Sequence, residues 1–93
     1  MHLLDRTRIV ASQQQVSCDF SGEAAILNLK NGVYYGLDPI GARIWNLIQE
    51  PRTLAELRHI LIAEYDVDAA RLESDIRDLL QRLAENELVE ISG

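Results

Sequence analysis

The sequence predicts an α+β domain in which a three-stranded antiparallel sheet precedes three helices, in the order β-β-β-α-α-α. The hydrophobic period changes once, near Asp38, from the two-residue alternation of strands to the three- and four-residue spacing of helices. Ahead of that change, the pair Asn31-Gly32 is typical of a tight hairpin, because both residues tolerate positive φ. The chain has 93 residues, 47% of them hydrophobic, which suits one domain over residues 1–93.

Three strand-like runs make up the predicted sheet. Residues 16–20 alternate between apolar and polar side chains. Residues 25–29 place aliphatic side chains at every second position, as half-buried strands do: Ala25, Leu27 and Leu29 alternate with Ile26 and Asn28. Ser21-Gly22 is expected to form the turn between these runs. The hairpin at Asn31-Gly32 then returns the chain as a third strand, Val33 to Leu37, which completes a meander.

Each predicted helix begins at a capping signal. Asp38-Pro39 starts the first helix, which runs to about residue 49, because an Asp side chain caps free N–H groups and a proline there loses no hydrogen bond. Residues 53–56, Thr-Leu-Ala-Glu, form a capping box for the second helix, which ends near residues 66–67. Asp68 offers a cap for the third helix, residues 68–85, and Asn86 ends it.

The helices carry apolar stripes that define the predicted core. Trp45 of the first helix is expected to be a core anchor. The third helix has five aliphatic residues at helical spacing: Leu72, Ile76, Leu79, Leu80 and Leu83. The closing residues 88–91 are expected to form either a short strand or an apolar tail that folds back onto the sheet or the helices.

Charge and composition exclude several classes of partner. The net charge of −6 repels phosphate backbones and anionic lipid, so neither nucleic acid nor a membrane surface is an expected partner. No apolar run approaches the roughly 18 residues that a membrane span requires, and the N-terminus lacks a signal-peptide pattern. The one cysteine, Cys18, cannot form an internal disulfide and is expected to be a small buried residue. We therefore expect a cytoplasmic protein.

Residues for catalysis or for ligand chemistry are sparse. An enzyme would need a nucleophile with a base, or paired carboxylates, in one pocket, and the two histidines, His2 and His59, fall at the N-terminus and on a solvated helix face. One cysteine and two distant histidines do not have the spacing of a metal site. The scattered glycines form no phosphate-binding loop. We expect no enzymatic activity, no metal and no cofactor.

The last strand of the predicted meander is the strongest functional signal. A terminal strand presents a row of free N–H and C=O groups, which invites a further strand. Domains that capture an extended peptide work in this way, with backbone bonds for affinity and side-chain pockets for selectivity. Two alternatives stay open: the edge is covered by the chain's own tail, or it joins copies of a structural subunit.

Three tandem helices raise the alternative of a transcriptional regulator with a DNA-reading helix-turn-helix. The third helix would then be the recognition helix. Residues 68–85 contain three arginines and five acidic residues, a net charge of −2. Phosphates repel such a helix, so DNA binding is the alternative and peptide capture is the leading hypothesis.

Three segments carry a family resemblance: Gly-Val-Tyr-Tyr-Gly-Leu-Asp at 32–38, Gly-Ala-Arg-Ile-Trp at 41–45 and Thr-Leu-Ala-Glu-Leu at 53–57. Over roughly residues 5–92 the chain resembles the PqqD-like family of peptide chaperones, which are also called RiPP recognition elements. Its short, free-standing form is most similar to the B1 proteins of lasso peptide biosynthesis. The resemblance implies a winged helix-turn-helix-like domain with no reaction of its own.

The resemblance also implies a function and partners. It implies an adaptor that binds the leader segment of a ribosomally synthesised precursor peptide and presents it to modifying enzymes. The partners implied are the precursor leader peptide, a separate B2-type leader protease and a cyclase, in a bacterial cytoplasm. In the family, the leader adds as an antiparallel strand to the third strand and lies against the third helix.

Carried onto this chain, the resemblance predicts the residues of the peptide site. The strand residues are Val33, Tyr34 and Tyr35, whose backbone is expected to pair with the leader. The helix residues nearest the leader are an apolar set that lines a pocket and two acidic residues that meet basic leader residues: Leu72, Ile76 and Leu79, with Asp75 and Asp78. Because any amphipathic helix would bury the apolar three, a pocket role and a core role both stay open for them.

Overall fold

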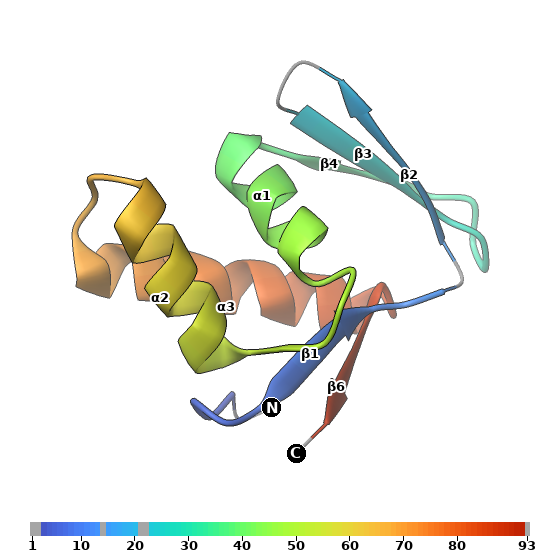
Figure 1. Cartoon of the computed structure of the whole chain (residues 1–93). Coiled ribbons are helices and arrows are strands. Elements are labelled where there is room, and N and C mark those ends of the chain that lie inside the picture. Colours follow the sequence, from blue (N-terminus) through green and yellow to red (C-terminus); the bar gives the residue numbers. More distant parts are fainter. Residues whose placement is uncertain (1–2, 14, 21–22, 93) are drawn as a thin grey trace.

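The computed structural model describes residues 3–13, 15–20 and 23–92, in the element order β1-β2-β3-β4-α1-β5-α2-α3-β6 (Figure 1). The helices of this described part are α1 (Pro39–Leu47), α2 (Leu54–Glu64) and α3 (Ala69–Glu85). Its strands are β1 (Arg8–Ala11), β2 (Gln15–Phe20), β3 (Glu23–Asn28), β4 (Tyr34–Leu37), β5 (Arg52–Thr53) and β6 (Val89–Ser92). The predicted α+β class, with an antiparallel sheet and three helices, is confirmed.

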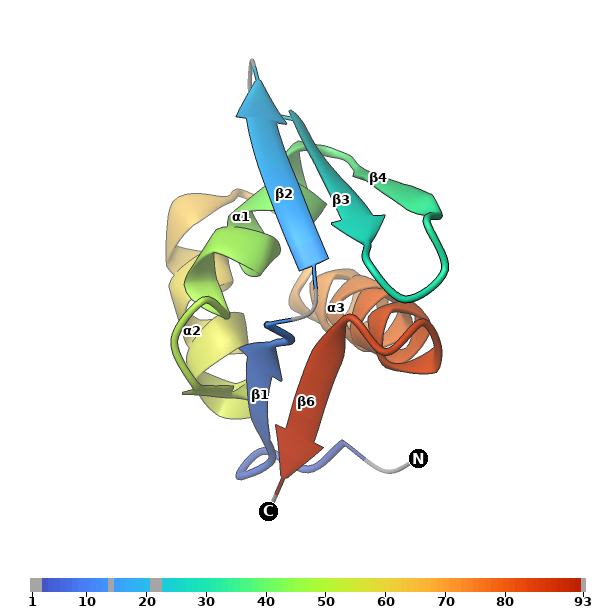
Figure 2. The same ribbon diagram turned by 90° about the vertical axis from the view of Figure 1, so that its right-hand side faces the viewer.

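The described strands form two separate antiparallel sheets. One has the order β2-β3-β4 and is the predicted meander, and the other has the order β5-β1-β6. β1 is the centre of the second sheet, where Ile9 lies opposite Arg52 of β5 and Ile91 of β6. The two sheets lie at different ends of the molecule, with α1 beside the meander and β1 next to β6 (Figures 1 and 2). We refer to them as the meander and the closing sheet.

The predicted order β-β-β-α-α-α was wrong in its strands, because β1 and β5 were not foreseen and a further strand, β6, follows the helices. β6 is a strand, which was one of the two expectations for residues 88–91, but it pairs with β1. β1 is the short run Arg-Ile-Val-Ala, and β5 has 2 residues. Both are strands because partners far along the chain complete their hydrogen bonds, and no local pattern indicates such partners.

The hairpin between β3 and β4 is confirmed. Gly32 has a φ of +70°, and its N–H donates to the carbonyl of Asn28 at 2.8 Å. β3 pairs with β4 from Ala24 opposite Leu37 to Leu27 opposite Tyr34. The turn expected at Ser21-Gly22 lies outside the described residues, as does the side chain of Cys18.

The capping predictions hold for α1 and α2. The Asp38 carboxylate accepts the N–H of Gly41 at 2.7 Å. The Thr53 hydroxyl accepts the N–H of Glu56 at 3.1 Å, and the Glu56 carboxylate accepts the N–H of Thr53 at 2.9 Å. Asp68 stands at the N-cap of α3, but its side chain makes no capping hydrogen bond, so that expectation was wrong. Asn86 ends α3 as predicted.

The helices and both sheets share one hydrophobic core. α3 packs against α1, α2 and β6, while β3 and β4 pack against α1. Trp45 is 2% exposed and is a core anchor, as expected. Among the β3 side chains that the structure describes, those of Ile26 and Asn28 are buried, whereas Ala25 and Leu27 are half-buried on the opposite, outer face of the meander. Among the residues that the structure describes, no helix combines the length and the apolar character that crossing a membrane requires.

Candidate functional site

β4 is a terminal strand of the meander, and in the described part of the chain no strand pairs with its outer side. The C-terminal segment, which was one candidate for covering this edge, pairs with β1 in the closing sheet. The possibility that the chain's own tail occupies the edge is therefore excluded. An unpaired edge of this kind is available to another strand.

The free backbone groups of this edge belong to Tyr34 and Gly36. The N–H of Asn28 donates to the carbonyl of Val33 at 3.0 Å, which makes this pair a hydrogen-bonded one. Hydrogen-bonded and non-hydrogen-bonded pairs alternate along an antiparallel ladder. Leu27–Tyr34 and Ala25–Gly36 are therefore non-hydrogen-bonded pairs. Consequently the N–H and C=O groups of Tyr34 and Gly36 point away from β3, toward the open side.

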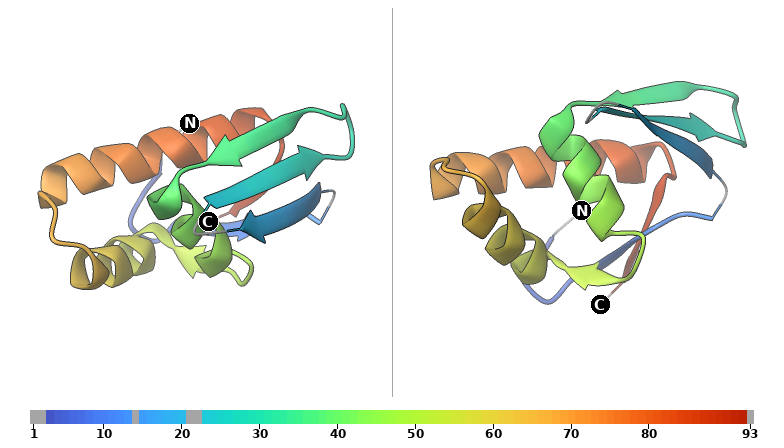
Figure 3. Two further views of the ribbon diagram at one scale, coloured as in Figure 1. Left: turned by 90° about the horizontal axis from the view of Figure 1, so that it is seen from above. Right: turned by 45° about the horizontal axis from the view of Figure 1, so that its top comes forward.

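A groove of about 420 Å³ lies between β4 and α3. β4 contributes residues 35–37 to its lining, α1 contributes Ile40, Gly41 and Ile44, and α3 contributes Asp75, Asp78, Leu79 and Arg82. Seen from above, β4 is the strand of the meander that lies nearest to α3 (Figure 3). We call this hollow the β4–α3 groove. It runs beside the same strand that has the free backbone groups.

The groove continues toward the start of α3. A second hollow of about 410 Å³ shares Ile40 and Asp75 with the first. Val67, Arg71 and Leu72 also line it. The two hollows together form a trough along α3 whose lining extends from Val67 to Arg82, so an extended segment paired to β4 can continue along the helix.

Most of the helix residues predicted for the site line this trough. Asp75, Asp78 and Leu79 line the β4–α3 groove, together with Tyr35 from the strand. Leu72 lines the second hollow. Leu72 and Leu79 are 2% and 7% exposed, so each is a core residue whose outer surface faces the trough.

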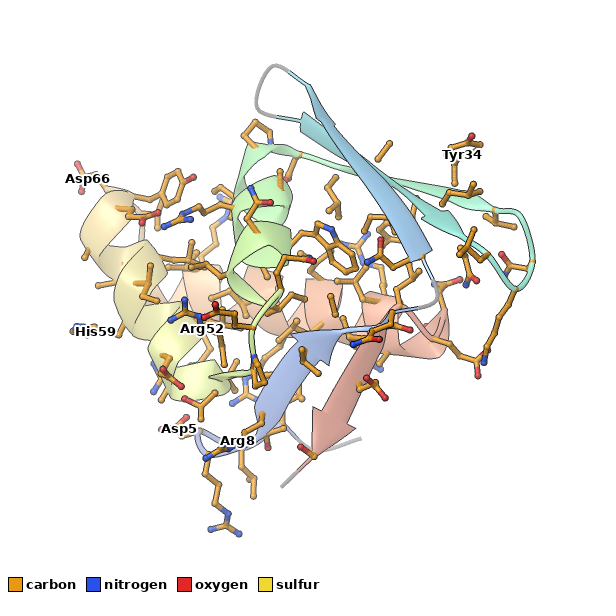
Figure 4. The ribbon with its side chains drawn as sticks, turned by 45° about the vertical axis from the view of Figure 1, so that its right-hand side comes forward. Asp5, Arg8, Tyr34, Arg52, His59 and Asp66 are labelled. Carbon is orange, nitrogen blue, oxygen red and sulfur yellow. The ribbon has the colours of Figure 1, made fainter. Side chains whose placement is uncertain are left out.

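Three of the predicted residues line neither hollow. Ile76 has 0% exposure and lines neither hollow, which makes it a core residue behind the trough. Tyr34 is 72% exposed, and its side chain points away from the helices (Figure 4). Val33 lies in the hairpin, where its N–H donates to the Asn31 side chain at 3.0 Å and its carbonyl is paired to Asn28. The backbone of Val33 is therefore already used within the hairpin.

The β4–α3 groove is acidic. Asp38, Asp75 and Asp78 line it, and Arg82 is the cation in its lining. Asp38 is engaged as the cap of α1, whereas the ion pairs among the described side chains involve neither Asp75 nor Asp78. Two unpaired carboxylates beside an open strand attract a positively charged segment.

Several lining residues that sequence reasoning missed come from the junction of β4 with α1. Ile40, Gly41 and Ile44 belong to the first turns of α1, which leave directly from the edge strand. A β-carbon at Gly41 would lie 3.1 Å from the Asp38 carboxylate, so the glycine makes room for the cap. The sequence contained a signal for these residues, namely the helix start at Asp38-Pro39 directly after the predicted edge strand. A helix that starts there must begin beside that edge.

Metal-ligating side chains are not gathered in the part of the chain that the structure describes. No three His, Cys, Asp or Glu side chains there lie close enough together to hold a metal ion. His59 lies on the exposed side of α2 (Figure 4). The trough itself combines backbone groups, aliphatic surface and carboxylates, which suits recognition of an extended segment.

The fold and the groove define the chain as a small α+β domain with an open strand edge beside a trough. The family model described as coenzyme PQQ synthesis protein D (PqqD) matches residues 23–89, and the chain belongs to this family. A solved structure described as TbiB1 in complex with the TbiA(beta) leader peptide is similar to it, with a TM-score of 0.80 and 41% sequence identity. That match covers 87% of this chain and 94% of TbiB1. Curated protein sequences gave no significant match.

Proposed function

We propose that this chain is a non-catalytic adaptor that binds the leader segment of a ribosomally synthesised precursor peptide and presents it to a leader protease. The observation that carries the proposal is the open edge of β4, where Tyr34 and Gly36 direct free backbone groups toward the trough along α3. The similarity to TbiB1, which was solved with a leader peptide, supports it.

The leader would run antiparallel to β4. Its N-terminal part would then lie beside residues 36–38 and continue along α3, and its C-terminal part would lie beside Tyr34. Side chains of a strand alternate between its two faces, so every second leader residue would enter the trough. Leu72 and Leu79 would supply apolar contact there, and Asp75 and Asp78 would attract basic leader residues. Tyr35 would contact the leader from the strand side.

The remaining predicted residues have indirect roles in this proposal. Tyr34 would bind through its backbone, because its side chain points away from the trough. Val33 would contact the end of the leader through its side chain, which is 54% exposed. Ile76 would support Leu72 and Leu79 from the core.

The biosynthetic class proposed is that of lasso peptides, in which residues 1–93 act as one domain in the cytoplasm beside a B2-type protease and a cyclase. The 41% identity with TbiB1 over most of both chains supports this class. The tandem helices α2 and α3, flanked by strands, support a winged helix-turn-helix-like description. No observation favours the alternative of DNA binding. Residues 68–85 contain three arginines and five acidic residues, and a helix with this net negative charge is repelled by phosphates.

The test is calorimetric titration with the synthetic leader of the precursor gene that neighbours this one. Wild-type protein is expected to bind with micromolar or tighter affinity, with amide shifts concentrated at residues 33–37 and 71–79. Gly36→Pro removes an outward N–H that no internal bond uses, so binding should fall at least tenfold. Gly36→Ala is the matched control, because a β-carbon there meets no atom within 4 Å. Absence of wild-type binding to any neighbouring leader would refute the proposal.

A further inference from the structure

Asn28, the last residue of β3, is one of the buried polar residues of the described part, with an exposure of 4%. Its side-chain amide donates to the carbonyl of Asn86 at 2.7 Å. Its side-chain oxygen accepts the N–H of Lys30 at 2.9 Å. One side chain therefore joins the β3–β4 hairpin to the C-terminal end of α3, which lies 58 residues further along the chain.

The end of α3 is built so that the Asn86 carbonyl is available. The N–H of Leu88 donates to the carbonyl of Leu83 at 2.9 Å, and the N–H of Glu87 donates to that of Ala84 at 3.0 Å. With Glu87 at a φ of +57°, this is a Schellman ending, which satisfies the last carbonyls inside the helix. The carbonyl of Asn86 takes no part in these two hydrogen bonds, and it accepts the hydrogen bond from Asn28.

The Asn28–Asn86 bond joins the hairpin that leads into β4 to the end of α3, next to the β4–α3 groove. β4 is one wall and α3 is the other. At one end of β4 the chain passes through Asp38 directly into α1, which lines the groove and packs on both walls. At the other end, β4 follows the hairpin that Asn28 holds against the end of α3. The width of the groove at this end therefore depends on the buried amide.

A second contact spans the same gap but is weaker. The Lys30 ammonium lies 3.4 Å from the Glu87 carboxylate, and both side chains are more than half exposed. Exposed ion pairs contribute little, whereas a buried hydrogen bond with one fixed donor and one fixed acceptor restricts geometry. Lys30 is therefore the natural comparison for Asn28.

We propose that Asn28 is a positioning residue of the groove, which holds β4 at the distance from α3 at which an added strand contacts both. Its effect on affinity rests on the proposed leader binding, while its effect on the free protein does not. A groove held at the bound width lowers the ordering cost of binding.

The first experiment uses the free protein. Asn28→Asp keeps the acceptor for Lys30 and nearly the same volume, but the ionised side chain cannot donate to Asn86. ¹⁵N relaxation dispersion is expected to reveal millisecond exchange at Tyr35, Gly36 and Leu79 in this variant and not in wild type. Lys30→Ala, the matched control, should behave like wild type. If Asn28→Asp proves too unstable, Asn28→Ala removes the donor to Asn86 together with the acceptor for Lys30.

The second experiment measures the affinity of the same variants for the neighbouring precursor's leader, at a temperature where thermal melts find them folded. Asn28→Asp is expected to bind about tenfold more weakly than wild type, and Lys30→Ala within about twofold. The inference would be overturned if the folded Asn28→Asp variant bound the leader with wild-type affinity and showed no millisecond exchange at the groove residues. If wild type itself binds no leader, the proposed function fails, and the relaxation data still decide whether Asn28 holds the groove.

Discussion

The meander and the closing sheet are both three-stranded and antiparallel, yet they differ in what their strands join. The meander links consecutive segments through a short hairpin, and one of its edges, β4, is open beside the groove. The closing sheet joins three distant segments, with the buried Ile9 in its central strand. A local sheet thus has the open edge at which we propose that the leader binds, and a sheet of long-range pairs secures segments near both ends of the chain.

The difference shows how an edge stays open. Exposed edges invite unwanted pairing, and the C-terminal strand was the segment expected from the sequence as a possible cover for β4. β6 is engaged over four residue pairs with β1, from Arg8–Ser92 to Ala11–Val89. Under the proposed function, the closing sheet serves stability and the meander serves recognition. Substitutions in one sheet should therefore change stability, and substitutions beside the other should change leader affinity.

The largest expected effect is on the closing sheet. Ile9→Ala removes a side chain with 0% exposure from the central strand. The loss of packing is expected to lower the free energy of unfolding by about 2–4 kcal/mol, measured by chemical denaturation. Leader affinity at low temperature should stay near that of wild type, because Ile9 lines neither hollow. A variant that loses affinity while fully folded would break the separation between the two sheets.

The next effect is on the groove beside the meander. Asp75→Lys reverses a charge that lines both hollows, and it should weaken binding of a leader with basic residues about tenfold, or about 1.4 kcal/mol. Glu85→Lys makes the same change in net charge on α3 outside both hollows, and it should leave the affinity nearly unchanged. Titration calorimetry measures both. Equal losses in the two variants would mean that net charge, and not the groove, attracts the leader.

A smaller effect is expected at the link from α3 to the closing sheet. Glu87 has a φ of +57°. This conformation is unfavourable for a residue that has a β-carbon, but not for glycine. Glu87→Gly should raise the free energy of unfolding by about 0.5–1 kcal/mol, even though the exposed contact with Lys30 is lost. Glu90→Gly, in the strand β6, should instead lower it. Thermal melts of both variants decide whether strain is located at Glu87.

The smallest effect is a dependence of stability on acid at the entry to the closing sheet. The Arg58 guanidinium donates to the Asp5 carboxylate at 3.1 Å, and this hydrogen bond lowers the pKa of Asp5 below its ordinary 3.8. A lowered pKa means that the contribution to stability is complete above the ordinary value and is lost as the pH falls through the lowered one.

The stability difference between wild type and Asp5→Asn should therefore be constant at neutral pH and should shrink as the pH falls below 3.8. Denaturation curves across that range measure it. In an Arg58→Gln background the pH dependence of the difference should shrink strongly, because the ion-pair partner of Asp5 is gone and only the weaker attraction of Arg77 is left. Its persistence at full size would assign the acid sensitivity to another group.

Much of the fold was predictable from local pattern. The caps at Asp38 and Thr53 and the hairpin at Gly32 each depend on groups within four residues along the chain. The helical stripe of α3 correctly indicated five buried residues. Interactions of such short range leave their signature in neighbouring residues, which is why single-sequence reasoning finds them.

The candidate site was predictable only in part. Strand and helix were identified, and Asp75 and Leu79 line the groove as expected. The sequence did not predict which aliphatic residues of α3 face the trough, because Ile76 and Leu79 have the same chemistry and differ only in what packs over them. The sequence also did not predict that the Asn28 side chain points inward, because its hydrogen-bond partner lies 58 residues away.

By itself, the sequence determined the caps, the meander, the acidic charge and the amphipathic third helix, since each follows from residues close together in the chain. Only the tertiary structure decided that β6 pairs with β1 and leaves β4 open, and that a buried amide joins the hairpin to α3. These outcomes come from competition between distant segments for the same partners. Such a competition is settled by the burial and hydrogen bonding of the whole molecule, which no local window contains.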